Sequence, residues 1–150
     1  MRKKYFGVSV KYVYFALLIF SCHDMERQKF KLEFSMRSVP VTLLWSYISS
    51  ASGLKEWFAD SVTVAGKKYT FEWNRQRQSA VVLGCRNEQS IRFRWDDTVG
   101  RDYFEMSISV NELTDSTTLT IVDFAEPDDM DDAKELWETQ VDTLRRVLGC

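Results

Sequence analysis

Histidine, cysteine and proline are scarce in this sequence, and each scarcity excludes a kind of protein. The 150 residues include one histidine, His23, two prolines, and three cysteines that form no CxxC pair: Cys22, Cys85 and Cys150. This spacing argues against a structural zinc site or a disulfide framework. Beyond His23 there is no imidazole, which removes Ser-His-Asp, Cys-His and His-metal chemistry. We therefore expect no catalytic triad, no bound metal and no cofactor.

The chain also lacks a large excess of charge of either sign. Its net charge is -2, and acidic and basic residues are mixed along most of the chain. No basic face of the kind that binds nucleic acid is present, so we expect no nucleic-acid partner. Hydrophobic residues make up 45% of the chain and aromatic residues 14%, which is enough for the core of one ordinary domain.

Residues 1–24 differ from the rest. A basic start at residues 2–4 precedes an apolar run over residues 12–20. That run is shorter than the ~20 residues a transmembrane helix needs, so we expect no integral membrane segment.

Two interpretations of residues 1–24 stay open. In the one we favour, Met25 is the true start and residues 25–150 are a cytoplasmic domain. In the other, the segment is a signal sequence with a poor lipoprotein cleavage box, and the protein is secreted or lipid-anchored at Cys22.

Period-two alternation predicts a strand at residues 28–37, where Phe30, Leu32, Phe34 and Met36 share one face. Two short helices are expected next. Ser38 or Thr42 would cap the first, with Pro40 in its first turn, and the second would cover Leu54–Ala59. Further strands are predicted at residues 61–64, 68–73, 78–86, 90–96, 103–112 and 117–124. Their short polar connections favour antiparallel hairpins.

A long helix is predicted over residues 129–148. Acidic residues open it, and apolar residues then recur at helical spacing: Leu136, Trp137, Val141, Leu144, Val147 and Leu148. The order of elements indicates an α+β helix-grip fold. A curved antiparallel sheet of six to seven strands would surround the C-terminal helix, with two short helices after the first strand.

The sequence also resembles a known family. Residues 42–58 contain the segment Gly53-Leu54-x-x-Trp57-Phe58, residues 90–95 end in Phe-x-Trp, and residues 136–148 form a Trp-led helix with paired leucines. Together they resemble START-like proteins related to the activator of the ninety-kilodalton heat-shock protein's ATPase. The resemblance covers nearly all of residues 28–148. It implies a superfamily of lipid and polyketide binders, cyclases, hormone receptors and co-chaperone-like modules, among which the fold does not choose.

Our first functional hypothesis is a non-enzymatic module that binds a hydrophobic or lipid-like small molecule between the sheet and the C-terminal helix. The alternative for each lining residue is simple core packing. The candidate lining residues are Trp45, Trp57, Phe58, Phe71, Trp73, Phe93, Trp95, Met106, Trp137, Val141 and Leu144.

Arg92 and Arg94 are a further possibility, because either arginine could orient an acidic ligand. They alternate with Phe93, however, so if Phe93 points inward both arginines face solvent. We expect the solvent-facing arrangement.

Two other hypotheses remain. A protein-interaction module of co-chaperone type would need an exposed patch, for which the acidic stretch 126–132 is a candidate, although helix capping also explains it. A cyclase- or hydrolase-like enzyme could use Asp96, Asp97, Asp102 or Glu105, although such acids are usually solvated loop charges. Cys85 is expected to be a buried strand cysteine without a base to activate it.

Overall fold

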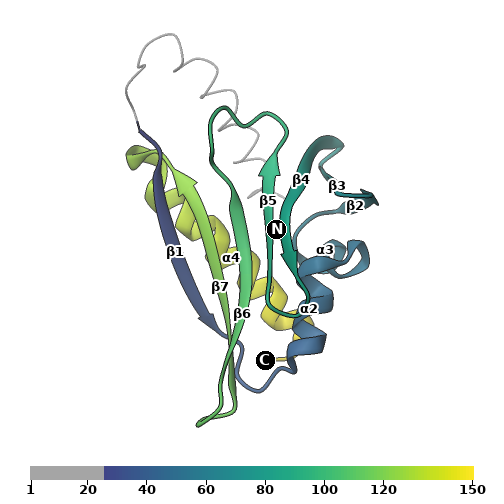
Figure 1. The fold of residues 1–150 in the computed structure, drawn as a ribbon, viewed down its shortest axis with the longest axis vertical. Coiled ribbons are helices and arrows are strands. Elements are labelled where there is room, and N and C mark those ends of the chain that lie inside the picture. Colours follow the sequence, from purple (N-terminus) through teal and green to yellow (C-terminus); the bar gives the residue numbers. More distant parts are fainter. Residues whose placement is uncertain (1–25) are drawn as a thin grey trace.

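The computed structural model describes residues 26–150, whose strands form one sheet backed by a long helix (Figure 1). Both interpretations of residues 1–24, including the role of Cys22, lie outside the described residues. The elements in order are β1 (Gln28–Ser35), α2 (Val41–Ser49), α3 (Ala51–Trp57), β2 (Ser61–Ala65), β3 (Lys68–Trp73), β4 (Gln76–Arg86), β5 (Ser90–Trp95), β6 (Phe104–Asn111), β7 (Ser116–Ala125), the 3-10 turn η1 (Pro127–Asp129) and α4 (Met130–Leu148).

The sheet of residues 26–150 has seven strands in the order β1-β7-β6-β5-β4-β3-β2. Every neighbouring pair is antiparallel. All neighbours are consecutive along the chain except β1 and β7, which join the first strand to the last. This arrangement confirms the predicted α+β helix-grip fold.

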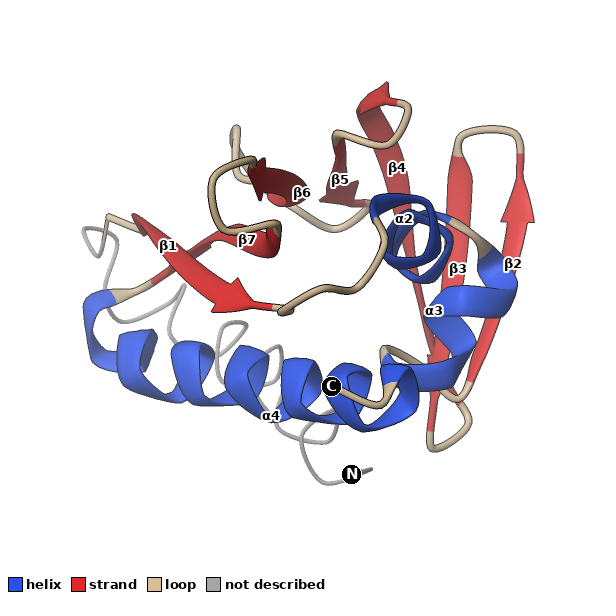
Figure 2. Cartoon of the chain, turned by 90° about the horizontal axis from the view of Figure 1, so that it is seen from below, coloured by secondary structure: helices blue, strands red, loops and turns tan. Residues whose placement is uncertain are grey.

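The sheet curves over α4, and α2 and α3 lie toward its β2–β3 end (Figure 2). Side chains alternate between the two faces of each strand, as the period of two requires. On β3, Tyr69, Phe71 and Trp73 are buried, and on β5 so are Ile91 and Phe93. The concave face therefore carries the large apolar side chains, and α4 covers them together with α2 and α3.

Each predicted strand lies within two residues of an observed one. The largest differences are at the end of β1 and the start of β4. Met36 was expected inside the first strand, but it follows β1, where its backbone N–H donates to Thr117 O at 2.8 Å. Its side chain is fully buried all the same.

The starts of the two short helices differ from the prediction. Pro40 takes the N-cap position of α2, with no side-chain cap, and Thr42 donates instead to Glu88 Oε1 at 2.9 Å. The second helix begins at Ala51, three residues before the predicted Leu54, because the Ser50 hydroxyl accepts a hydrogen bond from Gly53 N. A serine at this position pairs an otherwise orphaned N–H group and favours helix initiation.

Helix α4 matches its predicted range closely, following the single turn η1. Asp129 is its N-cap but makes no side-chain capping bond, so the acidic start acts on the helix dipole rather than through a cap. Gly149 ends the helix at φ 76°, a left-handed conformation that glycine adopts without steric cost.

The inner face of α4 includes Trp137, Val141 and Leu144, all buried as predicted. Leu136 is only half-buried. Val147, expected on the same face, is 39% exposed. It belongs to the last turn of α4, where fewer elements cover the helix.

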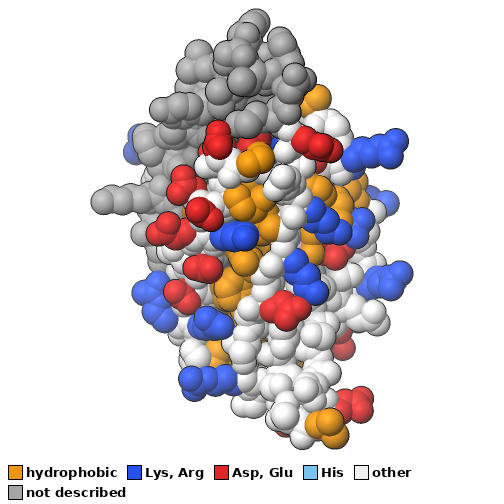
Figure 3. Space-filling view, turned by 90° about the vertical axis from the view of Figure 1, so that its left-hand side faces the viewer, with side chains coloured by type: hydrophobic (Ala, Val, Ile, Leu, Met, Phe, Trp, Pro, Cys, Tyr) orange, Lys and Arg blue, Asp and Glu red, His pale blue; other side chains and the backbone are white. Residues whose placement is uncertain are grey.

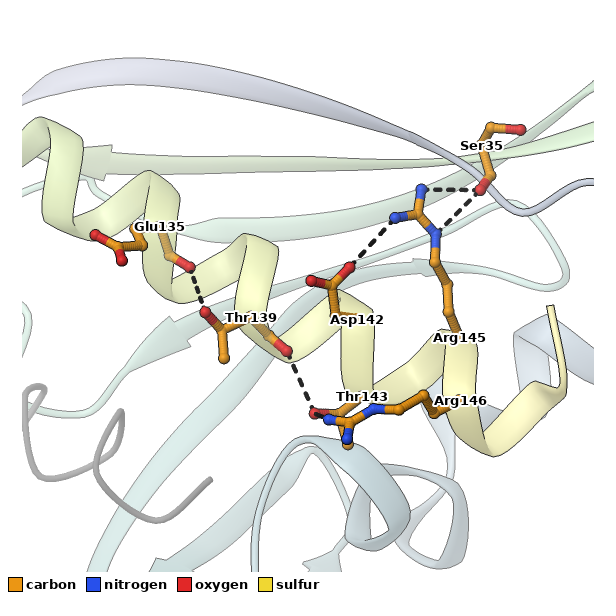
Figure 4. Close-up of polar contacts among 7 residues, drawn as sticks. All are labelled: Ser35, Glu135, Thr139, Asp142, Thr143, Arg145 and Arg146. Atoms are coloured by element: carbon orange, nitrogen blue, oxygen red, sulfur yellow. Dashed lines mark hydrogen bonds and ion pairs between the residues drawn. The ribbon is translucent and has the colours of Figure 1, made fainter.

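Arg145 links α4 to the edge strand β1 (Figure 4). Its guanidinium donates to Ser35 O at 3.0 and 3.3 Å and to Asp142 Oδ1 at 3.4 Å. The same group lies 5.7 Å from the centroid of the Phe34 ring. These contacts fix the C-terminal half of α4 beside the end of β1.

Cys85 is exposed, contrary to the sequence prediction. A β-bulge shifts the register of β4 against β5 between Val82 and Gly84. From Leu83 to Arg86 every residue of β4 is exposed. Cys85 thus lies on a strand end that the rest of the structure does not cover.

Gly53 of α3 lies close to the backbone of α2. A Cβ atom there would lie 2.5 Å from Tyr47 Cα and closer still to the Ser46 carbonyl oxygen. We expect Gly53→Ala to lower the free energy of unfolding by about 1–3 kcal/mol or more, because backbone atoms must move to accept the methyl group. Gly84→Ala is the matched control, since nothing lies within 4 Å of its added Cβ. Equal stability of the two variants in urea denaturation would contradict this account.

Tyr69 connects β3 to the end of α2, where its hydroxyl donates to Ser49 O at 2.6 Å. Burial, and secondly the nearby Cys85 thiolate, raise the pKa of Tyr69 above its usual value of 10.0. The folded state therefore holds the phenol proton more tightly than the unfolded chain. The resulting stabilisation is complete below pH 10 and is lost as the pH rises through the folded-state pKa.

We expect Tyr69→Phe to cost about 0.5–1.5 kcal/mol at pH 7, because the hydrogen bond to Ser49 is lost. The difference in unfolding free energy between wild type and variant should shrink as the pH is raised past 10. Tyr103→Phe is the control, because the Tyr103 hydroxyl makes no hydrogen bond to residues 26–150. A wild-type-to-variant difference that does not change with pH would exclude the proposed role of the phenol proton.

Candidate functional site

Five aromatic rings meet at one end of the concave face, and we call this group the aromatic cluster: Phe58, Trp73, Trp95, Phe104 and Trp137. Phe58 is central, with ring centroids 5.7 Å from Trp73, 6.1 Å from Phe104 and 5.9 Å from Trp137. Trp95 closes the group, 6.1 Å from Trp73 and 5.0 Å from Phe104. The spacing is that of direct aromatic contact.

The local structure explains why these rings converge. Phe58 is the C-cap of α3, and Trp73 and Trp95 are the last residues of β3 and β5. Phe104 opens β6 directly opposite Phe93 of β5. Trp137 lies on the inner face of α4 and is buried, as are Phe58, Trp73 and Phe104. Three strand ends, a helix end and a helix face thus place one ring each.

Hydrogen bonds fix two of the three indoles. Trp73 Nε1 donates to Phe58 O at 2.7 Å, and Trp137 Nε1 donates to Asp123 Oδ2 at 2.9 Å. Trp95 is different, because it is only half-buried and its indole N–H makes no hydrogen bond to residues 26–150. Trp95 is therefore the least buried ring of this cluster.

A second, deeper set of rings lies against the cluster. Phe71 and Phe93 are fully buried, with Phe93 stacked on Phe104 at 5.0 Å and Phe71 5.6 Å from Trp95. Trp57 is also buried, and its Nε1 donates to Tyr47 O at 2.8 Å. Around them the side chains of Met106, Val141 and Leu144 complete one continuous core.

All eleven sequence-predicted residues belong to this core or pack against it, nine of them buried and two, Trp45 and Trp95, at its edge. Trp45 lies on α2 and, among residues 26–150, makes no ring contact with the cluster. Whether any of these side chains lines a ligand site stays a prediction. The sequence analysis did not single out Phe104, which shares the buried period of β6 with Met106.

Gln140 is the polar residue of the core that sequence reasoning missed. It is 3% exposed, and it continues a buried stripe on α4 in which Ala133, Trp137, Gln140 and Leu144 follow at spacings of four, three and four. The helical spacing, extended to polar residues, would have identified it.

The core contains no cation. Among residues 26–150 no lysine or arginine is buried, and the one buried charged residue is Glu126, at 6% exposure. Arg92 and Arg94 point to the opposite face of β5 from Phe93, as expected. Arg92 Nε donates to Glu105 Oε2 at 2.8 Å, and Arg94 Nε donates to Asp102 O at 3.2 Å. Neither arginine reaches the concave side.

The acids considered for catalysis are dispersed. Asp96 forms an ion pair with Lys68 at 3.6 Å, Asp102 with Arg27, and Glu105 with Arg92. Asp97 is exposed in the loop after β5. These four acids do not come together on the concave face, so they form no convergent acid–base pair there.

The surface and the helices give two further observations. On the face that includes the edge strand β1, a narrow hydrophobic band runs between acidic and basic side chains (Figure 3). None of the helices between residues 26 and 150 is long and apolar enough to cross a bilayer.

Comparison with known proteins agrees with this architecture. A Bacteroides fragilis protein solved by solution NMR is 44% identical, with a TM-score of 0.62 over 82% of this chain and 92% of its own. An Aha1 dimer from Colwellia psychrerythraea is 12% identical, with a TM-score of 0.69 over 81% of this chain and 96% of that one. DynU16, from the dynemicin biosynthetic locus, is 18% identical, with a TM-score of 0.67 over 81% of this chain and 47% of that one.

The last two likenesses, at such low identity, show the fold alone. Among curated proteins the comparison finds no match. The family model of the START-like superfamily domain matches residues 24–150, nearly all of the chain. The chain belongs to the START-like superfamily.

Proposed function

We propose that this protein binds a hydrophobic small molecule between the concave face of the sheet and α4, and that it does so without covalent chemistry. One observation carries the proposal. Phe58, Trp73, Phe104 and Trp137 are buried, and the N–H groups of Trp73 and Trp137 donate hydrogen bonds, whereas Trp95 is half-buried and its N–H makes no hydrogen bond to residues 26–150. An apolar ligand would enter at this ring and pack against Phe58 and Trp137.

The chemistry of the core supports this assignment. Small-molecule sites are mostly apolar and aromatic, with few polar groups. The Phe58 side chain would contact a ligand at the proposed entry, because it follows the last turn of α3 and contacts rings from β3, β6 and α4. Phe58 lies between Trp73 and Trp137, so a ligand that displaced its ring would contact both indoles.

Binding of the neutral apolar fluorophore N-phenyl-1-naphthylamine tests the proposal. We expect wild type to bind it and Trp95→Ala to weaken binding about tenfold or more, because a large aromatic contact is lost. Trp45→Ala is the matched control, since Trp45 is also a half-buried tryptophan at the edge of the same core. Circular dichroism confirms that both variants fold. No binding by wild type, or equal losses in the two variants, would refute the proposal.

A protein-interaction role is the second candidate, favoured by exposed apolar residues on the outer face of the sheet. Val81 and Leu83 of β4 are 37% and 44% exposed. They lie on the strand next to Arg92 and Arg94, so apolar and charged groups are side by side. A partner docked there would leave the concave side untouched, and Trp95→Ala would not affect it.

A further inference from the structure

We infer that the free edge of β2 is a docking site for a second copy of this chain. The β2 strands of the two copies would pair antiparallel about a two-fold axis at Thr63, joining the two seven-stranded sheets into one. The inference concerns the edge of the sheet, so it stands apart from ligand binding on the concave face.

The sheet of residues 26–150 has two edge strands, β1 and β2, and they differ in protection. Native edges are shielded from other chains by charged side chains, proline or a covering element. On β1, Lys29, Lys31 and Glu33 alternate, and Arg145 of α4 donates to the Ser35 carbonyl. The sequence of β2, SVTVA, has neither charge nor proline, and its last three residues are exposed. In Figure 2, β2 lies at the outer margin of the sheet, and no helix or strand of residues 26–150 lies beyond it.

The hydrogen-bond pattern of the sheet shows which backbone groups of β2 point outward. Residues of a strand between two antiparallel neighbours bond alternately to one neighbour and to the other. Val82 N donates to Lys67 O at 2.8 Å, so Lys68 and Val81 oppose each other without bonding directly. The backbone groups of Lys68 are therefore turned toward β2, where Ala65 is its partner.

Thr63 lies two residues before Ala65 and likewise bonds to β3, opposite Thr70. Val62 and Val64 alternate with it, so their N–H and C=O groups point to the free edge. Apart from strand pairing, no hydrogen bond within residues 26–150 reaches either valine. Such a row of outward backbone groups is a template for a further strand.

The strand is self-complementary in this arrangement, which favours a second copy over an unrelated strand. An axis at Thr63 places Val62 opposite Val64 of the second copy, and Val64 opposite Val62. Because both valines turn their backbone groups outward, each opposed pair can exchange both of its N–H···O bonds. Their β-branched side chains also meet across the junction, on the side where Val64 is 42% exposed. The contact is two-fold and closes on itself, so it makes dimers rather than fibres.

The charges at the two ends of β2 are complementary in the same arrangement. Asp60 precedes the strand, and the exposed Lys67 follows it. Antiparallel pairing brings the end of one β2 beside the start of the other, so Lys67 of each copy approaches Asp60 of the second copy. Within β2 there is no charged side chain, so the junction brings no like charges together.

Sedimentation velocity of the full 150-residue chain tests the inference. Two short strands make a small interface, so we expect a weak dimer that forms as the concentration rises from about 10 μM to about 1 mM. Over the same range, amide exchange followed by NMR should slow at Val62 and Val64. It should not change at Thr63, whose N–H is already paired with β3.

Substitutions at the exposed Thr63 test the position of the axis. Thr63→Lys and Thr63→Glu each place like charges opposite one another, so each should raise the dimer dissociation constant about fivefold or more. An equimolar mixture of the two variants should restore the dimer, because opposite charges then meet at the axis. Recovery on mixing also shows that the single variants fold.

Ser109→Lys is the matched control, since it adds the same charge to an exposed position of β6, away from both edges, and should leave the dimer unchanged. Wild type that stays monomeric at the highest concentration overturns the inference. A dimer that neither Thr63 variant weakens also overturns it, because the contact then lies elsewhere. Dissociation in both variants without recovery on mixing rules out the axis at Thr63.

Discussion

The contact between α4 and the concave face of the sheet holds the rest of the structure in place. Its centre is Trp137, whose ring packs on Phe58 and Phe104 while its N–H donates to Asp123 of β7. A sheet with one apolar face must bury that face against another element. Helix α4 covers this face together with α2 and α3, and Arg145 holds the C-terminal part of α4 to β1. The curvature of the sheet, the position of α4 and the place of the edge strand β1 therefore depend on one another.

That constraint also explains where aromatic rings gather. The strands β3, β5 and β6 end or begin at the same edge of the concave face, and each places its terminal ring there: Trp73, Trp95 and Phe104. Phe71 and Phe93, in the strand centres, are fully buried, and among the three terminal rings Trp73 and Phe104 are buried while Trp95 is only half-buried. The same sheet that builds a closed core therefore leaves one ring at its margin only half-buried.

The sequence was most informative where periodicity is strict. Alternation in KYTFEW located β3 to the residue, and the helical recurrence after Asp129 located α4. It was least informative where one local interaction decides the structure. The Ser50 cap starts α3 earlier than the apolar pattern suggests, and a bulge in β4 leaves Cys85 uncovered. The burial of Gln140 was not predicted, because its side chain is polar although it lies at the helical spacing of the buried apolar residues.

Pairing of the first strand with the last has a consequence for how the protein is made. Gln28 lies opposite Ala125, so about a hundred residues separate partners that share a ladder. On the ribosome β1 has no neighbour until almost the whole chain has emerged, and the hairpins from β2 to β6 can assemble before it. Closure of the sheet is therefore a late, slow event, during which β1 waits as an unpaired strand exposed to chaperones and to other copies of the chain.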